Sequence, residues 1–195
     1  MATKDKPCIV VDTRDPLHTA YRFNYALPPE TDLLDYPSDT AALASPHYRF
    51  DPLRVDTVRK KLDSADYSVV GFENAWGVER KTLDDFVGTV IRARGRFEAE
   101  LERLVAFKIA RIVVEGSLED VVLHHYRAPG VHPNSILGSA WAIEADFGIP
   151  IVWAGDREHA ELYTQGLLCR LWMNAQKDNR QGELAFSVER PATGE

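Results

Sequence analysis

Residues 78–86 read Val-Glu-Arg-Lys-Thr-Leu-Asp-Asp-Phe, and they place three consecutive charges where an apolar strand meets a helix. Successive strand residues point to opposite faces of a sheet, so Glu79 and Lys81 share one face while Arg80 lies on the other. A carboxylate and an ammonium group therefore converge on one cleft. There, a carboxylate can hold a hard divalent cation, and a lysine can orient a water molecule and offset phosphate charge.

A second carboxylate comes from the apolar segment that precedes this strand, where Asp66 stands directly before Tyr67-Ser68-Val69-Val70. The loop at 71–77 is expected to fold the two segments into a hairpin, which brings Asp66 beside Glu79. Two acids and a lysine in this arrangement are typical of nucleases. Each residue also has a structural alternative, because Asp66 could cap a turn and the Glu79–Lys81 pair could be a weak surface ion pair.

Three further charged residues are candidates with structural alternatives. Asp12 ends an apolar strand, where it could be another metal-side carboxylate or could form an Asx turn. Asp85 could support the site, but Thr82-Leu83-Asp84-Asp85 has nearly the form of a capping box at a helix start. Arg80 could anchor the site from behind by pairing with Asp85 or with another carboxylate.

The order of these residues resembles the nuclease domain of the XPF-type structure-specific endonucleases, within the restriction-enzyme-like superfamily. The resemblance covers roughly residues 8–170 and rests on Ile9-Val10-Val11-Asp12-Thr13-Arg14-Asp15, Ala65-Asp66-Tyr67, and Glu79-Arg80-Lys81 followed by Asp85. Two positions depart from the family's pattern, because Ala65 replaces the usual Gly and Asp15 replaces the usual Glu. The compact layout is more similar to stand-alone bacterial or phage versions than to eukaryotic ones.

The resemblance implies a metal-dependent DNA endonuclease that acts on branched or flapped DNA in recombination or repair. It implies a catalytic set, with Asp85 in support, made of Asp66, Glu79, Lys81, Asp12 and Arg80. It also implies Mg²⁺, with Mn²⁺ as a substitute, bound by Asp66, Glu79, Asp12 and the Val78 carbonyl. Two alternatives stay open. One is a catalytically silent DNA-binding or scaffolding subunit, and the other is an enzyme that acts on RNA or simple DNA ends.

A basic cluster around Gly95 is a candidate phosphate clamp, and it consists of Arg92, Arg94, Arg96 and Arg103. Arg14, beside Asp12, is a further candidate DNA contact. Acidic residues interleave the cluster, so a solvated helix face is an equal alternative. The formal net charge of −7 argues against nonspecific coating of nucleic acid, but it permits an enzyme whose basic groups are clustered.

Length and composition restrict the remaining possibilities. A chain of 195 residues fits one domain with a full hydrophobic core. The two cysteines have no metal-ligand spacing and no apolar run approaches membrane-spanning length, so we expect a cytoplasmic protein without membrane contact. Neither Gly-x-x-x-x-Gly-Lys nor Gly-x-Gly-x-x-Gly occurs, so no nucleotide cofactor is expected.

Helical patterns between strand patterns predict an α/β fold, and the resemblance implies a restriction-endonuclease-like three-layer sandwich around a central mixed sheet. Strands are predicted at 8–11, 67–71, 76–80, 111–115 and 149–153, and helices at 82–91, 97–108, 136–147 and 156–173. The nuclease domain would span 1–175, with an insertion loop at 24–50. Residues 176–195 would form a polar tail in which 184–188 could add an edge strand.

The last predicted helix carries more apolar residues than one core-facing stripe needs. The family often forms dimers through helices near the end of this domain, so we expect a homodimer. A wide helix face buried against the sheet is the alternative.

Overall fold

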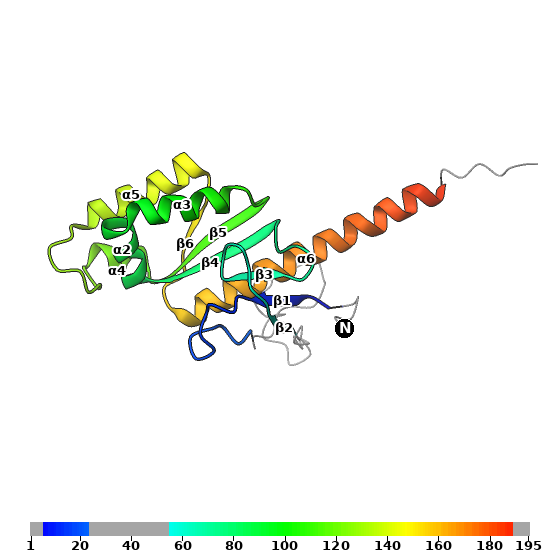
Figure 1. Cartoon of the computed structure of the whole chain (residues 1–195), viewed down its shortest axis with the longest axis horizontal. Coiled ribbons are helices and arrows are strands. Elements are labelled where there is room, and N and C mark those ends of the chain that lie inside the picture. The colour runs from blue at the N-terminus through cyan, green and yellow to red at the C-terminus, as the bar shows by residue number, and fades with distance from the viewer. Residues whose placement is uncertain (1–5, 24–54, 189–195) are drawn as a thin grey trace, which may run out of the picture.

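The computed structural model describes residues 6–23 and 55–188, which build a six-stranded sheet with helices on both faces (Figure 1). The strands follow the order β2-β1-β3-β4-β5-β6 across the sheet. They are β1 (Cys8–Val11), β2 (Asp56–Arg59), β3 (Tyr67–Val69), β4 (Trp76–Thr82), β5 (Ile109–Glu115) and β6 (Ile151–Trp153). β3 is antiparallel to both of its neighbours, whereas the other pairs are parallel, so the predicted mixed sheet is confirmed.

The helices divide into two layers. They are α2 (Leu83–Arg92), α3 (Arg94–Val105), α4 (Leu118–Val122), α5 (Pro133–Phe147) and α6 (Arg157–Val188). Helices α2, α3 and α5 share one hydrophobic core with alternate residues of β5, while α6 packs with β1 and β3 in a second core on the opposite face (Figure 1). The pleat of β5 shows this division, because Ile112 and Val114 belong to the first core and Val113 to the second. The α/β three-layer prediction is therefore confirmed.

Local sequence signals set most helix ends as predicted. The Thr82 hydroxyl accepts a hydrogen bond from the Asp85 backbone N–H and so caps α2. Helix α5 stops at Gly148, whose φ of 66° is a left-handed conformation that favours glycine. Asp156 accepts a hydrogen bond from the His159 backbone N–H, so it caps α6 as predicted.

Three predictions about the sheet and the tail differ from the structure or lie outside it. Strand β2 was not predicted, because three of its four residues are exposed and it lacks an apolar pattern. Helix α6 continues past Met173 to Val188, so 184–188 is helical and not an edge strand, since this polar stretch is rich in helix-forming residues and contains no proline. The predicted insertion loop at 24–50 lies outside the described residues.

The hairpin of β3 and β4 places the candidate acids. Tyr67 pairs with Val78, so Asp66 and Glu79 stand opposite each other, and the Asp66 N–H donates to the Val78 carbonyl at 3.0 Å. Close packing supports this hairpin, because a Cβ atom added at Gly77 would lie 3.0 Å from the Ala65 Cβ. The part of the chain that the structure describes has no helix long and apolar enough to cross a membrane.

Candidate functional site

Asp66 and Glu79 line a polar cavity of about 230 Å³ at the edge of the β3–β4 hairpin. Glu79 is buried, and its Oε1 accepts a hydrogen bond from Lys81 Nζ at 2.9 Å. Asp66 Oδ2 accepts a hydrogen bond from the Arg80 backbone N–H at 2.8 Å. The structure thus confirms that Glu79 and Lys81 share a face and that the hairpin brings Asp66 to them.

Burial gives the two carboxylates unusual electrostatics. Burial raises the pKa of Asp66 to about 6, and the charges of Asp15 and Glu100 add to this rise against the lowering by the Arg80 N–H. Burial also raises the pKa of Glu79 well above its ordinary value, and the neighbouring Asp66 carboxylate raises it further. Both carboxylates therefore lie where a neighbouring cation would offset the cost of their charge.

Lys81 responds in the opposite direction. Burial alone would lower the pKa of Lys81, but the carboxylates of Glu79 and Glu100 outweigh burial and hold this pKa above its ordinary value. Lys81 is therefore an ammonium group at neutral pH, and it can donate hydrogen bonds but cannot accept a proton.

The donor set fits Mg²⁺ in the way that this ion usually binds proteins. Mg²⁺ is commonly held by one or two carboxylates, while water and substrate phosphate oxygens complete its shell. Asp66 and Glu79 supply two such carboxylates, and the Val78 carbonyl keeps one lone pair beyond its bond to the Asp66 N–H. Within residues 6–23 and 55–188, no group of three or more His, Cys, Asp or Glu side chains is arranged to hold an ion. Water and substrate oxygens would therefore complete the shell.

Asp12, predicted as a metal-side carboxylate, takes the alternative role of a turn residue. Its Oδ1 accepts the backbone N–H and the Nε–H of Arg14, and its Oδ2 accepts Arg14 Nη2 and the Leu62 backbone N–H. These bonds overcome the effect of burial and lower the pKa of Asp12. Asp12 is fully buried and is not among the residues that line the cavity, and its role as a metal ligand stays a prediction.

Asp85 and Arg80 also have clear structural partners. The Asp85 carboxylate accepts a hydrogen bond from the Thr82 hydroxyl at 2.7 Å, which completes the predicted cap of α2. Arg80 lies behind the site, as predicted, and it pairs with Glu115 instead of Asp85. Its Nε and Nη2 contact the two carboxylate oxygens of Glu115 at 2.7 and 3.1 Å. Such a two-pronged pair is rigid, and it fixes the strand between Glu79 and Lys81.

The Arg80–Glu115 pair belongs to a larger network that we call the rear brace, made of Asp15, Tyr21, Tyr67, Arg80, Glu115 and Arg157. Arg157, at the start of α6, reaches Glu115 Oε1 at 3.4 Å and also donates to the Ala20 carbonyl. The guanidinium groups of Arg80 and Arg157 both lie about 5 Å from the centroid of the Tyr21 ring. Tyr67 donates to Asp15 at 2.6 Å. The rear brace thus connects the β3–β4 hairpin with β5 and α6.

Helix α3 covers the cavity with three side chains spaced at one-turn intervals: Arg96, Glu100 and Arg103. Glu100 Oε1 lies 3.8 Å from Lys81 Nζ, although no local sequence pattern distinguishes Glu100 from the solvated glutamates of the same helix. The available signal was spacing, because Phe97, Leu101 and Leu104 are buried and residues 96, 100 and 103 flank that buried stripe. Sequence reasoning missed Glu100.

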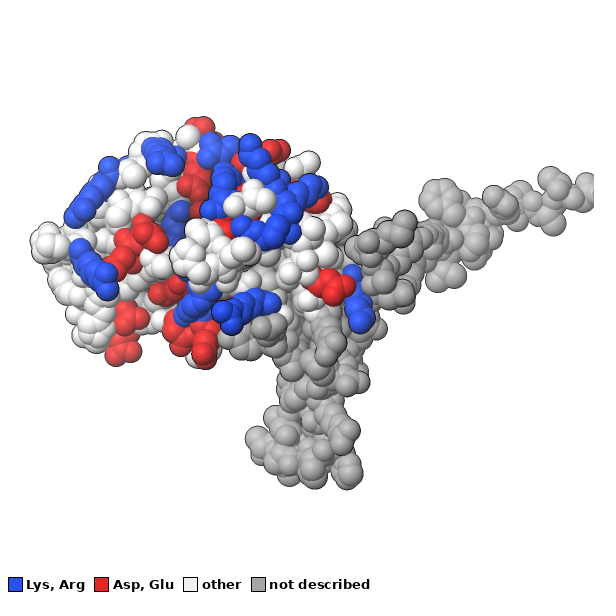
Figure 2. Space-filling view, turned by 60° about the horizontal axis from the view of Figure 1, so that its bottom comes forward, with Lys and Arg blue, Asp and Glu red and all other residues white. Residues whose placement is uncertain are grey.

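Only part of the predicted basic cluster reaches the cavity. Arg96 and Arg14 line it, together with Arg103, whereas Arg92 and Arg94 do not. Figure 2 shows Lys and Arg side chains gathered near the top of the described body, with Asp and Glu side chains between them. The chain is acidic overall, yet three arginines line the cavity that contains Asp66 and Glu79.

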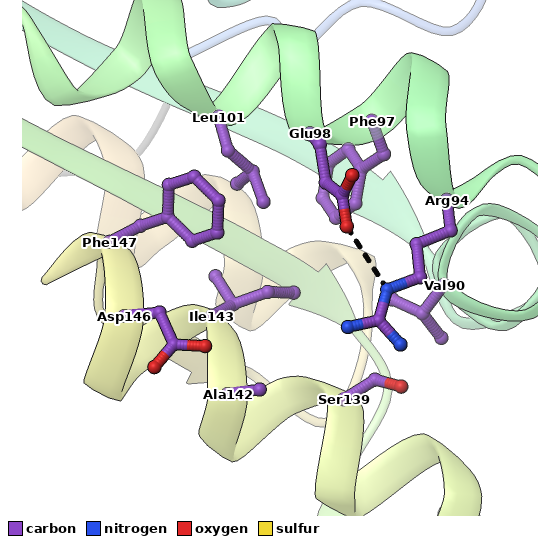
Figure 3. A pocket seen from close by; sticks show the side chains of 10 residues that line it. All are labelled: Val90, Arg94, Phe97, Glu98, Leu101, Ser139, Ala142, Ile143, Asp146 and Phe147. Atoms are coloured by element: carbon purple, nitrogen blue, oxygen red, sulfur yellow. Dashed lines mark hydrogen bonds and ion pairs between the residues drawn. The ribbon is translucent and has the colours of Figure 1, made fainter.

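Arg94 instead stands at the rim of a second cavity of similar volume, about 230 Å³, between α3 and α5 (Figure 3). Its Nε pairs with Glu98 Oε1 at 3.1 Å, and the walls are mostly apolar side chains such as Phe97, Leu101 and Phe147. Its two carboxylates are Glu98, which pairs with Arg94, and Asp146 of α5, and no lysine is among its lining residues. We therefore place the candidate site in the polar cavity.

Comparison with known proteins agrees with this geometry. A family model described as "ERCC4 domain" matches residues 38–167. The solved structure of XPF from Aeropyrum pernix has a TM-score of 0.54 at 24% identity, and the match covers 96% of this chain and 76% of that one. A structure of XPF from Aeropyrum pernix in complex with DNA has a TM-score of 0.53 at 24% identity, covering 87% and 66%. Curated proteins give no match. The structural likeness shows a shared fold.

Proposed function

Because this chain belongs to the ERCC4 domain family, we propose that it is a metal-dependent DNA endonuclease that hydrolyses phosphodiester bonds. The observation that supports this most directly is that Asp66 and Glu79 line one cavity together with three arginines, while Lys81 donates a hydrogen bond to Glu79. Acids alone would repel a phosphodiester. Together with the Lys81 ammonium group and the lining arginines, these acids can hold a phosphodiester.

Each residue would have a distinct role. Asp66 and Glu79, with the Val78 carbonyl, would hold Mg²⁺ or Mn²⁺. The bound ion would stabilise the negative charge that develops on the phosphate and on the leaving 3′ oxygen. Lys81, kept protonated by its two carboxylate neighbours, would donate a hydrogen bond that orients the attacking water. The rear brace would keep Arg80, and hence the backbone N–H that binds Asp66, in place.

Arginines at the rim would position the DNA backbone. Arg96 and Arg103 line the cavity and have no ion pair with any described residue, so both are available to phosphates. Arg14 already forms an ion pair with Asp12, but its side chain is 58% exposed and can still contact a phosphate. The family resemblance favours branched or flapped DNA, in recombination or repair. RNA and simple DNA ends are the alternative substrates.

A cleavage assay with purified protein tests the proposal. We expect Mg²⁺-dependent or Mn²⁺-dependent cleavage of at least one member of a panel of flapped, forked and four-way DNA, linear duplex and RNA, at fixed salt. Asp66→Asn, Glu79→Gln and Lys81→Ala should each lose at least about 100-fold in rate, because each removes a group that acts on the reacting atoms. Glu119→Gln, at an exposed position of α4 that does not line the cavity, is the matched control and should retain cleavage.

The same assay distinguishes an active endonuclease from a catalytically silent DNA-binding or scaffolding subunit. A silent subunit would bind branched DNA and cleave nothing with either ion. Full activity of Asp66→Asn or Glu79→Gln would show that the chemistry lies elsewhere. Preference within the panel would decide between branched DNA and the alternative substrates.

We further propose a homodimer formed through α6. This helix has 32 residues, and its C-terminal part projects beyond the sheet (Figure 1). Near the sheet, Tyr163, Leu167 and Leu171 pack against the second core, so this part follows the alternative of a buried face. An isolated helix gains little stability in water, so a second copy beside the projecting part would stabilise it. Light scattering should give about twice 22.0 kDa, and a chain that ends at Asp178 should give the monomer mass.

A further inference from the structure

Lys81 is held from two sides, by its own strand and by helix α3. On the strand side, Nζ donates to Glu79 Oε1 at 2.9 Å. On the helix side, Nζ lies 3.8 Å from Glu100 Oε1 and 5.1 Å from the centroid of the Phe97 ring. Phe97 and Glu100 are three residues apart, so they project from the same side of α3. The ammonium group therefore sits in a socket with walls from both elements.

Glu100 contacts Lys81 and does not pair with the arginines on its own helix. Arg96 and Arg103 stand one turn before and after it on the same helix, where a glutamate commonly forms ion pairs. No such pair is formed, and Glu100 contacts Lys81 instead. Its side chain is 25% exposed, whereas that of Lys81 is 11% exposed, so Glu100 forms the outer wall of the socket.

We propose that Glu100 is a positioning residue, which fixes the Lys81 ammonium group for the hydrolysis proposed above. A long lysine side chain has several rotatable bonds, and one carboxylate on its own strand leaves the direction of the ammonium group loosely defined. A second carboxylate from a different element removes that freedom. Since misplacing a catalytic group by about 1 Å can cost on the order of 100-fold in rate, such a restraint matters to turnover.

The geometry predicts opposite effects of Glu100 on turnover and on DNA binding. Its negative charge lies between two arginines at the mouth of the cavity, so it repels the phosphates that they attract. Glu100→Gln should therefore lower kcat about tenfold and leave DNA affinity equal or a few-fold tighter. A residue that only stabilised the fold would not separate these two quantities.

The experiment compares Glu100→Gln and Glu100→Ala with Glu102→Gln, which removes the same charge from an exposed position of α3 outside the cavity. Single-turnover cleavage gives the rate, and fluorescence anisotropy with Ca²⁺ gives the DNA affinity. An amine-reactive reagent followed by mass spectrometry gives the labelling rate of Lys81 without any need for catalysis. We expect Lys81 labelling to rise several-fold in both Glu100 variants and to stay at the wild-type rate in Glu102→Gln. Glu100→Asp should recover part of the rate.

Wild-type kcat or wild-type Lys81 labelling in Glu100→Ala would overturn the inference. A parallel loss of rate, affinity and thermal stability would also overturn it, because that pattern indicates a structural role. If the wild-type protein cleaves no substrate, the proposed endonuclease function fails. The labelling comparison then still decides whether Glu100 positions Lys81.

Discussion

At the scale of single residues, the site contains two carboxylates, Asp66 and Glu79, whose charged forms are disfavoured by their surroundings. Burial disfavours the charged forms of Asp66 and Glu79 in the metal-free protein, and it raises the pKa of both carboxyl groups. Sites that bind cations commonly contain such carboxylates, since the bound ion supplies the positive charge that the protein around them lacks. The stability of the free protein and its capacity to bind an ion should therefore change in opposite directions.

Asp66→Asn should stabilise the metal-free protein at neutral pH. The native pKa of Asp66 is about 6 against an ordinary 3.8, so the native state binds more protons than the unfolded state in this interval. Stability should fall as pH rises from about 4 to about 6, and the variant lacks this loss. Since each pKa unit corresponds to about 1.4 kcal/mol and partial exposure screens the effect, we expect a gain of about 1–2 kcal/mol at pH 7.5.

Urea denaturation of wild type and Asp66→Asn from pH 4 to pH 8, with chelator present, measures this difference. The two stability curves should converge near pH 4. Added Mg²⁺ should raise the melting temperature of the wild type more than that of the variant. An Asp66→Asn protein that is less stable than wild type at pH 7.5 would contradict the expectation.

Ala65 has a strained backbone conformation that the surrounding sequence does not predict. Its φ is 69°, in the left-handed region, which costs a residue with a side chain roughly 1–2 kcal/mol. This conformation explains why the family usually has glycine at the position. Ala65 is also buried, so its methyl group contributes about 0.8 kcal/mol of burial, and glycine would lose a further 0.5–1 kcal/mol of chain entropy.

Ala65→Gly should therefore change the free energy of unfolding by less than about 1 kcal/mol, because the gain and the losses nearly cancel. Ala65→Val should be strongly destabilising, since a branched side chain meets both the left-handed backbone and Gly77. Urea denaturation of the two variants tests this pair. A loss above 2 kcal/mol in Ala65→Gly would show that packing outweighs strain.

At the scale of elements, the hairpin of β3 and β4 is supported from two sides. Helix α3 meets its front face through Phe97 and Glu100, and the rear brace meets its back face through Arg80. Glu115 is central to the rear brace, because it contacts both Arg80 and Arg157 and its side chain is only 9% exposed. Removing this carboxylate would leave Arg80 with only the longer contact to Asp15 at 3.8 Å.

Glu115→Ala should cost about 3–5 kcal/mol of stability, because the Arg80 guanidinium would then be buried without its main partner. Cleavage should fall as well, since Arg80 positions the backbone N–H that binds Asp66. Glu119→Ala, at an exposed position of α4, is the control and should stay within about 0.5 kcal/mol. A Glu115→Ala protein with wild-type stability would show that the rear brace contributes little.

Local patterns were sufficient for part of this arrangement and insufficient for the rest. Strand alternation predicted that Glu79 and Lys81 share a face, and the turn signals predicted the hairpin that brings Asp66 to them. Long-range pairing is invisible to such patterns, so Glu115 and Arg157 were not identified as partners of Arg80. The hydrogen bond from the distant Leu62 N–H to Asp12 is invisible to local patterns for the same reason. Strand β2 is exposed and owes its existence to pairing with β1.

At the scale of the whole molecule, positive side chains line the candidate site although the chain as a whole is negatively charged. The chain has a formal net charge of −7, yet the cavity that holds the acids is lined by three arginines. Such an arrangement weakens nonspecific attraction to nucleic acid while it keeps a local attraction at one place. DNA binding should therefore be sensitive to salt and should depend on few cationic side chains.

The salt dependence of DNA binding should count those side chains. For duplex DNA, the logarithm of the binding constant falls with the logarithm of salt concentration at a slope of about −0.9 for each phosphate neutralised. Removing Arg96 and Arg103 together should reduce the magnitude of the slope by about 2, because both line the cavity without an ion-pair partner in the described chain. The control is Arg92→Ala with Arg94→Ala, which removes the same charge nearby but outside the cavity. Fluorescence anisotropy from 50 to 300 mM salt gives both slopes. If the control pair reduced the slope more than the Arg96 and Arg103 pair, the DNA would follow the outer side of α3 instead of the acid-lined cavity.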